Sequence, residues 1–163
     1  MNFKLVLRLA GKTLLVEAAC MALPLVVALL YREDPMPFLL AIGITAVVGL
    51  LLSLVKSDTA FHAREGFFSA GLIWVLAGVS GALPFYFCGD FASFVDCFFE
   101  SISGFTTTGS SILPAVEGLP KGILFWRSFT HWLGGMGILV LTIALLPSLG
   151  ARTLHVMKAE SPG

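Results

Sequence analysis

The sequence has 163 residues, of which 57% are hydrophobic and only 12% are charged, and its basic and acidic residues balance to a net charge of zero. A mean hydropathy of +0.94 excludes a soluble globular domain, and the balanced charge gives no reason to expect a nucleic-acid partner. The composition predicts an all-α membrane protein surrounded by lipid.

Four apolar runs approach or exceed the length of about 20 residues that a helix needs to cross a hydrocarbon core about 30 Å thick. In chain order they are residues 13–31, 38–55, 66–87 and 122–147. The basic flank before the first run resembles the start of a secretory signal peptide, but the run is too long for one and has no small-residue cleavage site. We expect it to be kept as a membrane span.

The positive charges beside these runs predict the orientation of the chain. If all four runs cross, one side carries most of the flanking charges, which are Lys4, Arg8, Lys12, Lys56, Arg64, Arg152 and Lys158. Only Arg32 and Lys121 fall on the other side. Because cytoplasmic loops are enriched in Lys and Arg, both termini are predicted to be cytoplasmic.

The spacing of the runs divides the chain into three parts. Residues 1–65 form a predicted N-terminal transmembrane hairpin with a short loop, and residues 148–163 form a predicted cytoplasmic tail. Between them, residues 66–147 contain two spans separated by residues 88–121. A segment of that length is either an outer domain or a part that dips back into the membrane.

Apolar residues inside this segment recur at helical spacing and predict an amphipathic helix over residues 91–103. Asp90 is placed to be its N-cap, and Gly104 to end it. At about 1.5 Å per residue the helix is roughly 20 Å long, so it reaches only part of the way across a bilayer.

The residues that follow read FTTTGSS, 105–111. A helix that ends at membrane depth is tolerated only where protein or a water-filled cavity covers its end. Small hydroxyl residues can hold an extended backbone, Gly109 admits unusual dihedral angles, and rows of carbonyls replace the hydration shell of a cation in selectivity filters. We predict a re-entrant half-helix followed by an extended filter segment, 106–111. The alternative is a polar outer loop beside an interfacial helix.

Two ionisable residues, Arg127 and His131, lie four apart in the last run, where such groups are costly and often functional. Either can meet Glu100 of the half-helix. A salt bridge or hydrogen bond behind the filter is favoured over direct contact with an ion, although Arg127 is also near enough to the surface to snorkel. A single histidine without other ligands at suitable spacing is a poor metal site.

Other single residues carry smaller predictions. Glu17 is expected to reach the cytoplasmic interface rather than relay protons, and Pro24 to kink the first span. Gly134, with Thr130 one turn before it, favours close helix packing over a hinge. The odd number of cysteines gives no disulfide framework, so we expect free thiols, although Cys88 and Cys97 flank the outer mouth and could pair.

The order of a span, a half-helix, SGFTTTGSS and a second span reading FWRSFTHWLGGMGILVL resembles the first pore repeat of the Trk-type potassium uptake transporters. Within the superfamily that also holds the Ktr and HKT transporters, it is most similar to the TrkH membrane subunits, and the resemblance extends over the whole chain. It implies a fold in which four helix–pore loop–helix repeats of one polypeptide surround a single ion path.

The resemblance also implies the site. The filter segment, contributing mainly backbone carbonyls, would be Thr106, Thr107, Thr108 and Gly109, with potassium bound at the last three. The residues that support it would be Glu100, Ser110, Arg127 and His131. Glycine at position 109, where some sodium-selective relatives have serine, implies potassium as the transported ion, and no cofactor is expected in this chain.

Family members lie in the bacterial inner membrane, form homodimers and bind a TrkA-like cytosolic regulatory subunit that carries the nucleotide site. This sequence has one repeat where the family has four. We therefore expect it to be the N-terminal part of a longer transporter, whose other three repeats complete the filter, and not to conduct alone.

Two other classes of function are alternatives to a transporter. A non-conducting membrane scaffold would have the same composition, and a filter differs from it in having carbonyls that face a shared axis. An intramembrane serine hydrolase would need Ser110 or Ser111 beside His131, but no G-x-S-x-G turn is present. We expect no enzyme.

Overall fold

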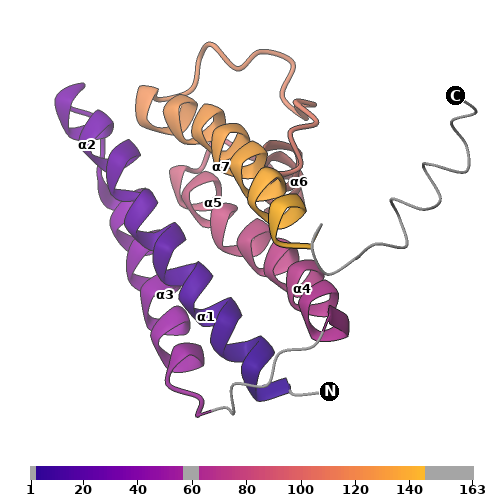
Figure 1. Cartoon of the computed structure of the whole chain (residues 1–163). Helices are drawn as coiled ribbons and strands as arrows, with labels where there is room; N and C mark the ends of the chain where they lie inside the picture. Colours follow the sequence, from indigo (N-terminus) through magenta and orange to yellow (C-terminus); the bar gives the residue numbers. More distant parts are fainter. Residues whose placement is uncertain (1–2, 57–62, 146–163) are drawn as a thin grey trace, which may run out of the picture.

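The computed structural model describes residues 3–56 and 63–145, with side chains for residues 3–56 and 68–137. The described chain is helical throughout, apart from turns and loops, which confirms the all-α prediction (Figure 1). The helices are α1 (Phe3–Cys20), α2 (Ala22–Leu30), α3 (Met36–Ser53), α4 (Ala63–Gly81), α5 (Leu83–Cys88), α6 (Phe94–Phe105) and α7 (Lys121–Leu145).

Three helical stretches are long and apolar enough to cross a membrane: Phe3–Leu30, Met36–Ser53 and Phe68–Cys88. They correspond to the first three predicted spans, although the first helix begins well before residue 13. The fourth predicted span forms α7, whose side chains are described only as far as Gly137. Its crossing therefore stays a prediction, and the predicted tail lies outside the described residues.

Two of the long stretches are bent at prolines. α1 gives way to α2 just before Pro24, and α4 to α5 just before Pro84. A proline has no N–H for the carbonyl four residues earlier, and its ring pushes that turn away. The backbone still bridges the first bend, because Met21 N donates to Glu17 O at 2.9 Å. The predicted kink at Pro24 is confirmed.

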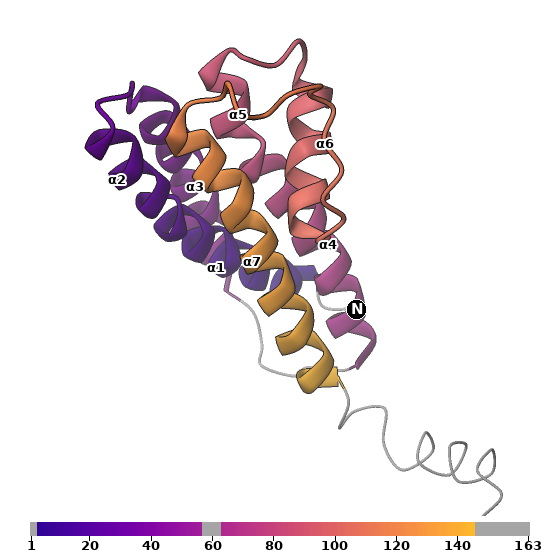
Figure 2. The same ribbon diagram turned by 90° about the horizontal axis from the view of Figure 1, so that it is seen from above.

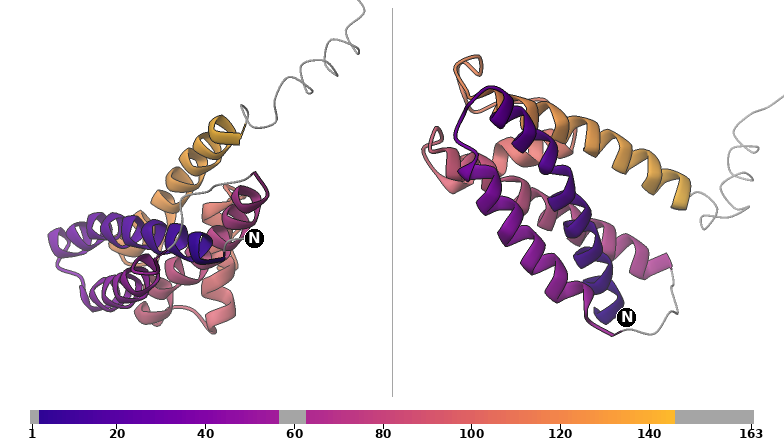
Figure 3. Two further views of the ribbon diagram at one scale, coloured as in Figure 1. Left: turned by 60° about the horizontal axis from the view of Figure 1, so that its bottom comes forward. Right: turned by 90° about the vertical axis from the view of Figure 1, so that its left-hand side faces the viewer.

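Two glycines allow the two helices of the N-terminal hairpin to pack closely. α1 and α3 lie side by side (Figure 3), and a Cβ on Gly11 would come within 2.5 Å of Ser53 N and 2.7 Å of Gly49 O. A side chain at either glycine would separate the two backbones, so the close crossing depends on both.

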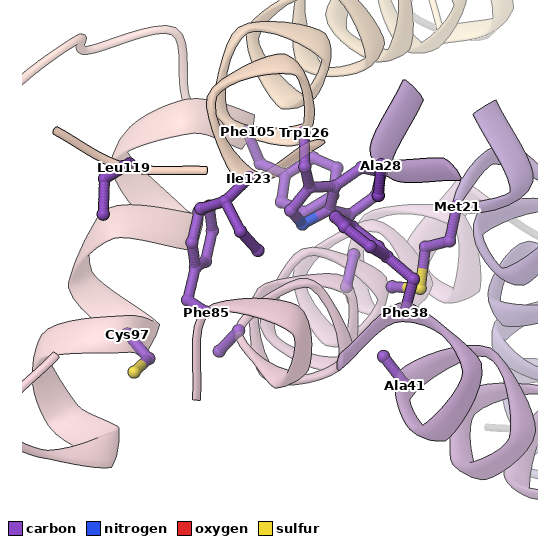
Figure 4. Close-up of a cluster of buried hydrophobic side chains, with 12 residues drawn as sticks. Met21, Ala28, Phe38, Ala41, Phe85, Cys97, Phe105, Leu119, Ile123 and Trp126 are labelled. Atoms are coloured by element: carbon purple, nitrogen blue, oxygen red, sulfur yellow. The ribbon is translucent and has the colours of Figure 1, made fainter. Parts of the chain in front are cut away.

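Buried side chains from both halves of the chain meet in one core (Figure 4). Trp126 of α7 is fully buried, packs edge-on against Phe105 at 6.4 Å between ring centroids, and donates Nε1–H to Gly81 O at 2.9 Å. Phe38 and Met21 of the hairpin join the same cluster. The bend between α4 and α5 is thus held by α7, and the tryptophan N–H has the acceptor that burial demands.

The helix that corresponds to the predicted half-helix lies later in the sequence than predicted. It spans Phe94–Phe105, and its N-cap is Ser93, whose Oγ accepts from Asp96 N at 3.2 Å. The prediction of Asp90 as cap was wrong, because the chain first turns at Gly89 (φ 80°) and only Ser93 takes the extended backbone that a cap requires. Gly104 lies inside the helix instead of ending it.

The prediction for Glu17 was also wrong. Its side chain is only 5% exposed, and its Oε2 lies within hydrogen-bond distance of Ser80 Oγ of α4, at 2.6 Å. Glu17 lies on the side of α1 that packs against α4. Its polar partner is therefore a side chain of the neighbouring helix, whereas a residue at the membrane interface would have water as its partner. The three cysteines are free thiols.

Candidate functional site

The chain reverses direction directly after α6. Four backbone N–H groups bond back to the carbonyls of the last helical turn: Thr106 to Ile102 (2.8 Å), Thr107 to Gly104 (2.9 Å), and Thr108 and Gly109 to Ser103 (2.9 and 3.3 Å). The orphan carbonyls at the helix end are satisfied in this way. The reversal requires positive φ at Thr107 (57°) and Gly109 (78°). The prediction that extended backbone begins at residue 106 was therefore wrong, because Thr106 and Thr107 form a turn.

These hydrogen bonds also orient the carbonyls of the segment. The described chain contains no cis peptide bond, and in a planar trans peptide the N–H and C=O groups point in opposite directions. The N–H groups of residues 107–109 point toward the end of α6. The carbonyls of Thr106, Thr107 and Thr108 therefore point away from it.

The side of the segment that carries these carbonyls is open. Residues 106–110 are all exposed. The hydroxyls of Thr106 and Thr108 lie 2.8 Å apart and share a hydrogen bond, while Thr106 Oγ1 also donates to Ile102 O at 2.8 Å. The threonine side chains are thus fixed to one another and to the helix, so that backbone oxygens are left to face outward.

The chain then runs back along α6 toward its N-terminal end (Figure 2). Ser103 Oγ donates to Ser110 O at 2.6 Å. One turn earlier on the helix, Glu100 Oε2 accepts from Ser111 Oγ at 3.0 Å and from Ile112 N at 3.2 Å. Two side chains of α6, Ser103 and Glu100, therefore hold the returning segment in place.

Glu100 also binds the last helix. Its other oxygen, Oε1, accepts from Arg127 Nε in an ion pair between α6 and α7. The carboxylate is 1% exposed and the arginine side chain 18%. A buried charge is tolerated when it is paired and its remaining lone pairs are hydrogen-bonded, and the partners of Glu100 meet that condition. Of the two predicted partners of Glu100, the structure brings Arg127 to it.

His131 lies elsewhere. Its Nδ1 is 2.8 Å from Arg127 O on its own helix, and its Nε2 is 3.8 Å from the position that a Cβ on Gly109 would occupy. The imidazole therefore stands behind the glycine of the segment. Ser111 uses its hydroxyl on Glu100, an arrangement that does not resemble a serine nucleophile activated by His131.

α6 and α7 are in backbone contact at the level of the reversal. A Cβ on Gly134 would overlap the carbonyl oxygen of Phe105, and a Cβ on Gly104 would overlap Thr130 Oγ1. This is the close packing that the small residues of α7 predict. Because Gly104 and Gly134 have no side chains, the end of α6 can pack directly against α7.

Two contributors to the site were missed from the sequence. Ser103 bonds Ser110 across the reversal, and Glu33 of the α2–α3 loop accepts from the backbone N–H groups of Lys121 (2.6 Å) and Gly122 (2.9 Å) at the start of α7. A capping residue normally stands next to its helix. No local pattern signals one that is so distant in the chain.

Comparison with known proteins identifies the family. The TrkH family model, described as a cation transport protein, matches residues 37–163. Over its whole length the chain is 37% identical to the Trk system potassium uptake protein TrkH of Halomonas elongata and 38% identical to that of Escherichia coli K12, covering 35% of each. It is 32% identical over 99% of its length to the E. coli protein TrkG, covering 34% of it.

The chain thus spans about a third of the length of the curated relatives it matches. The family match and the relatives together confirm the resemblance that the filter-like motif and its flanking helices suggest. The chain belongs to the TrkH family of cation transport proteins.

Proposed function

We propose that this chain supplies one of the four walls of a potassium filter in a Trk-type uptake transporter of the bacterial inner membrane. The observation that carries the proposal is the row of carbonyls at Thr106, Thr107 and Thr108 that points away from the end of α6. The names of the relatives, which are potassium uptake proteins, give the ion. A scaffold would have no need for such a row.

In this proposal potassium is bound at Thr107, Thr108 and Gly109, mainly by backbone oxygens. Neutral carbonyls replace the water around a potassium ion without holding it too tightly for release. α6 places the negative end of its dipole beside the segment, which favours a cation there. Ser103 and Glu100 keep the carbonyls in register by fixing the strand that follows.

The filter-support residues act behind this row. Arg127 neutralises the buried Glu100, the Ser110 carbonyl accepts a hydrogen bond from Ser103 Oγ, and His131 fills the space behind Gly109. The groups that would touch the ion are therefore kept separate from the groups that fix their positions. This division favours the support role for Arg127 and His131 over direct ion contact.

The exposed side of residues 106–110 is the surface that the other walls would cover. Unsatisfied carbonyls in hydrocarbon cost several kcal/mol each, so we propose that three further repeats of a longer polypeptide surround the ion with this one. The α6 reversal would be re-entrant from the outer face, with both termini of the chain in the cytoplasm. A homodimer and a TrkA-like cytosolic regulatory subunit complete the proposed assembly.

The test is potassium-dependent growth with rubidium uptake, in cells that lack their own potassium uptake systems. Three proteins are compared: the 163-residue chain, a full-length protein that contains it, and that full-length protein with Gly109→Ser. We expect uptake from the full-length protein alone, and weaker discrimination against sodium in the variant. Growth from the 163-residue chain would replace the one-wall proposal with a self-assembled pore. Unchanged selectivity in the variant would show that the filter assignment is wrong.

A further inference from the structure

Glu17 is a carboxyl group inside a predicted membrane span, and the proposed filter makes no use of it. It lies on α1, is 5% exposed, and has Oε2 at 2.6 Å from Ser80 Oγ of α4. Its other oxygen, Oε1, is buried and has no hydrogen-bond partner. Charges in this environment are costly unless they are paired.

The hydroxyl of Ser80 has too many acceptors for an ionised Glu17. Besides Glu17 Oε2, it lies 2.9 Å from Leu76 O and 3.3 Å from Ala77 O, and a serine hydroxyl has one proton and can also accept. If Glu17 carries a proton on Oε2, it donates to Ser80 Oγ, which donates to Leu76 O. The two shortest contacts of Ser80 Oγ, to Glu17 Oε2 and to Leu76 O, are then hydrogen bonds with one donor and one acceptor each.

Among the residues whose side chains the structure describes, no neighbouring helix offers a positive charge to an ionised Glu17. α1 packs against α2, α3 and α4, and neither α2, α3 nor residues 68–81 of α4 contain an ionisable residue. The ion pair that the described part of the chain shows joins Arg127 to Glu100 and does not involve Glu17. The described side chains that other helices contribute around Glu17 are therefore apolar or neutral.

On its own helix Glu17 is distant from the basic residues. Lys12, which is exposed, and Arg8 lie roughly 7 and 13 Å before it along the axis at about 1.5 Å per residue, and Cys20 is the thiol one turn after it. The ion pair among the described residues joins neither Lys12 nor Arg8 to Glu17. The number of hydrogen-bond donors indicates that Glu17 is protonated. The absence of a paired cation among the described residues leads to the same conclusion.

We propose that Glu17 is a proton-binding site within the membrane-embedded part of the protein. It is an uncharged carboxylic acid whose O–H donates to Ser80 Oγ, and the ligand it binds is a single proton. The inference goes beyond the proposed potassium filter and does not depend on it, because it concerns the contact between the N-terminal hairpin and the pore repeat.

The position of the acid gives it a structural consequence. The point that a Cβ on Gly81 would occupy lies 2.6 Å from Ser101 Oγ of α6 and 3.3 Å from Glu17 Oε1. Ser101 Oγ is also buried without a partner. Glu17 Oε1 and Ser101 Oγ thus lie on the same side of Gly81, and loss of the proton from Glu17 would place an unpaired charge there.

The test is infrared spectroscopy of the protein in lipid bilayers at neutral pH. We expect a carboxylic-acid C=O band that disappears in Glu17→Gln, a substitution that keeps the shape and can still donate to Ser80. Ser80→Ala should shift the band, because the acid loses its acceptor. Asp34→Asn, which changes an exposed carboxyl group, is the matched control and should leave the band unchanged.

The spectrum of the parent protein alone decides whether a protonated carboxyl group is present. The test therefore remains decisive if a variant fails to fold. A parent without a carboxylic-acid band at neutral pH would overturn the proposal. A band that persists in Glu17→Gln would assign the proton to another group, and a band unmoved by Ser80→Ala would overturn the hydrogen bond to Ser80. In support, a hydrophobic carbodiimide, which reacts with protonated carboxyl groups, should label Glu17 in membranes at neutral pH.

Discussion

Glu100 connects three parts of the site through one carboxylate. It accepts from Arg127 of α7 on one oxygen and from Ser111 and Ile112 of the returning strand on the other. The sequence predicts that Arg127 or His131 meets Glu100, since all are ionisable groups in an apolar environment. It does not predict the strand contacts, because these depend on where the chain reverses.

We expect Glu100→Ala to destabilise the full-length protein by about 3–5 kcal/mol, since it leaves the Arg127 charge buried without a partner. Unfolding in denaturant measures the change. In a double-mutant cycle, Arg127→Gln should cost much less in the Glu100→Gln background than in the parent. Additive effects would contradict an energetically coupled ion pair.

Thr107 holds a backbone conformation that its side chain opposes. Its φ of 57° is left-handed, which costs an ordinary L-residue about 1–2 kcal/mol and is most unfavourable for β-branched residues. Strain of this kind persists where surrounding structure enforces it. Here the enforcing contacts are the N–H bonds from residues 106–109 to the helix end.

Thr107→Gly should therefore be tolerated or slightly stabilising. Thr106→Gly should destabilise by at least about 0.5–1 kcal/mol, because residue 106 has a negative φ (−80°), glycine adds chain entropy to the unfolded state, and the hydrogen bonds of the Thr106 hydroxyl to Ile102 and Thr108 are lost. Thermal unfolding of the two variants compares neighbouring threonines of the same segment. Equal losses of stability would show that Thr107 carries no strain.

At the scale of elements, the half-helix is fixed by its contact with α7. Gly134 lies against the carbonyl of Phe105, and Gly104 against Thr130. The sequence predicts close packing of α7 from its small residues, but it does not identify the partner. The partner is the end of α6, so this contact sets the position of the candidate filter.

Gly134→Ala should displace the end of α6 and reduce rubidium uptake by the full-length protein at least tenfold. Gly135→Ala is the matched control: a Cβ there would meet its nearest neighbour, Thr107 Cγ2, at 3.9 Å, which is ordinary van der Waals contact. It should leave uptake near the parent level. Similar uptake in both variants would mean that the close contact at Gly134 does not position the filter.

At the scale of the whole molecule, the N-terminal hairpin is tied to the rest of the chain at both ends of α2. Met21 and Phe38 enter the core with Trp126, and Glu33 receives the first N–H groups of α7. A carboxylate at a helix N-terminus satisfies orphan donors and complements the dipole. The hairpin therefore helps to position α7 as well as to anchor the chain.

Glu33→Ala should lower stability by about 1–2 kcal/mol, the usual loss for a helix cap, and the start of α7 should become more accessible to amide hydrogen exchange. Asp34→Ala removes a neighbouring carboxylate that caps only its own loop, accepting from Met36 N at 3.0 Å. It should leave exchange in α7 unchanged. Equal protection of Lys121 and Gly122 in both variants would contradict the cap.

The sequence by itself determined the membrane environment, the first three spans, the kink at Pro24, the existence of a short amphipathic helix before the FTTTGSS motif, and the family. These follow from hydropathy, helical periodicity, proline geometry and a local motif, all of which act over a few turns of chain. Only the tertiary structure decided that Glu17 faces Ser80, that Glu33 caps α7, and that the carbonyls of residues 106–108 face outward. Each of these depends on which groups separated in the chain come within hydrogen-bond distance, or on how a turn closes, and a local pattern does not contain that information.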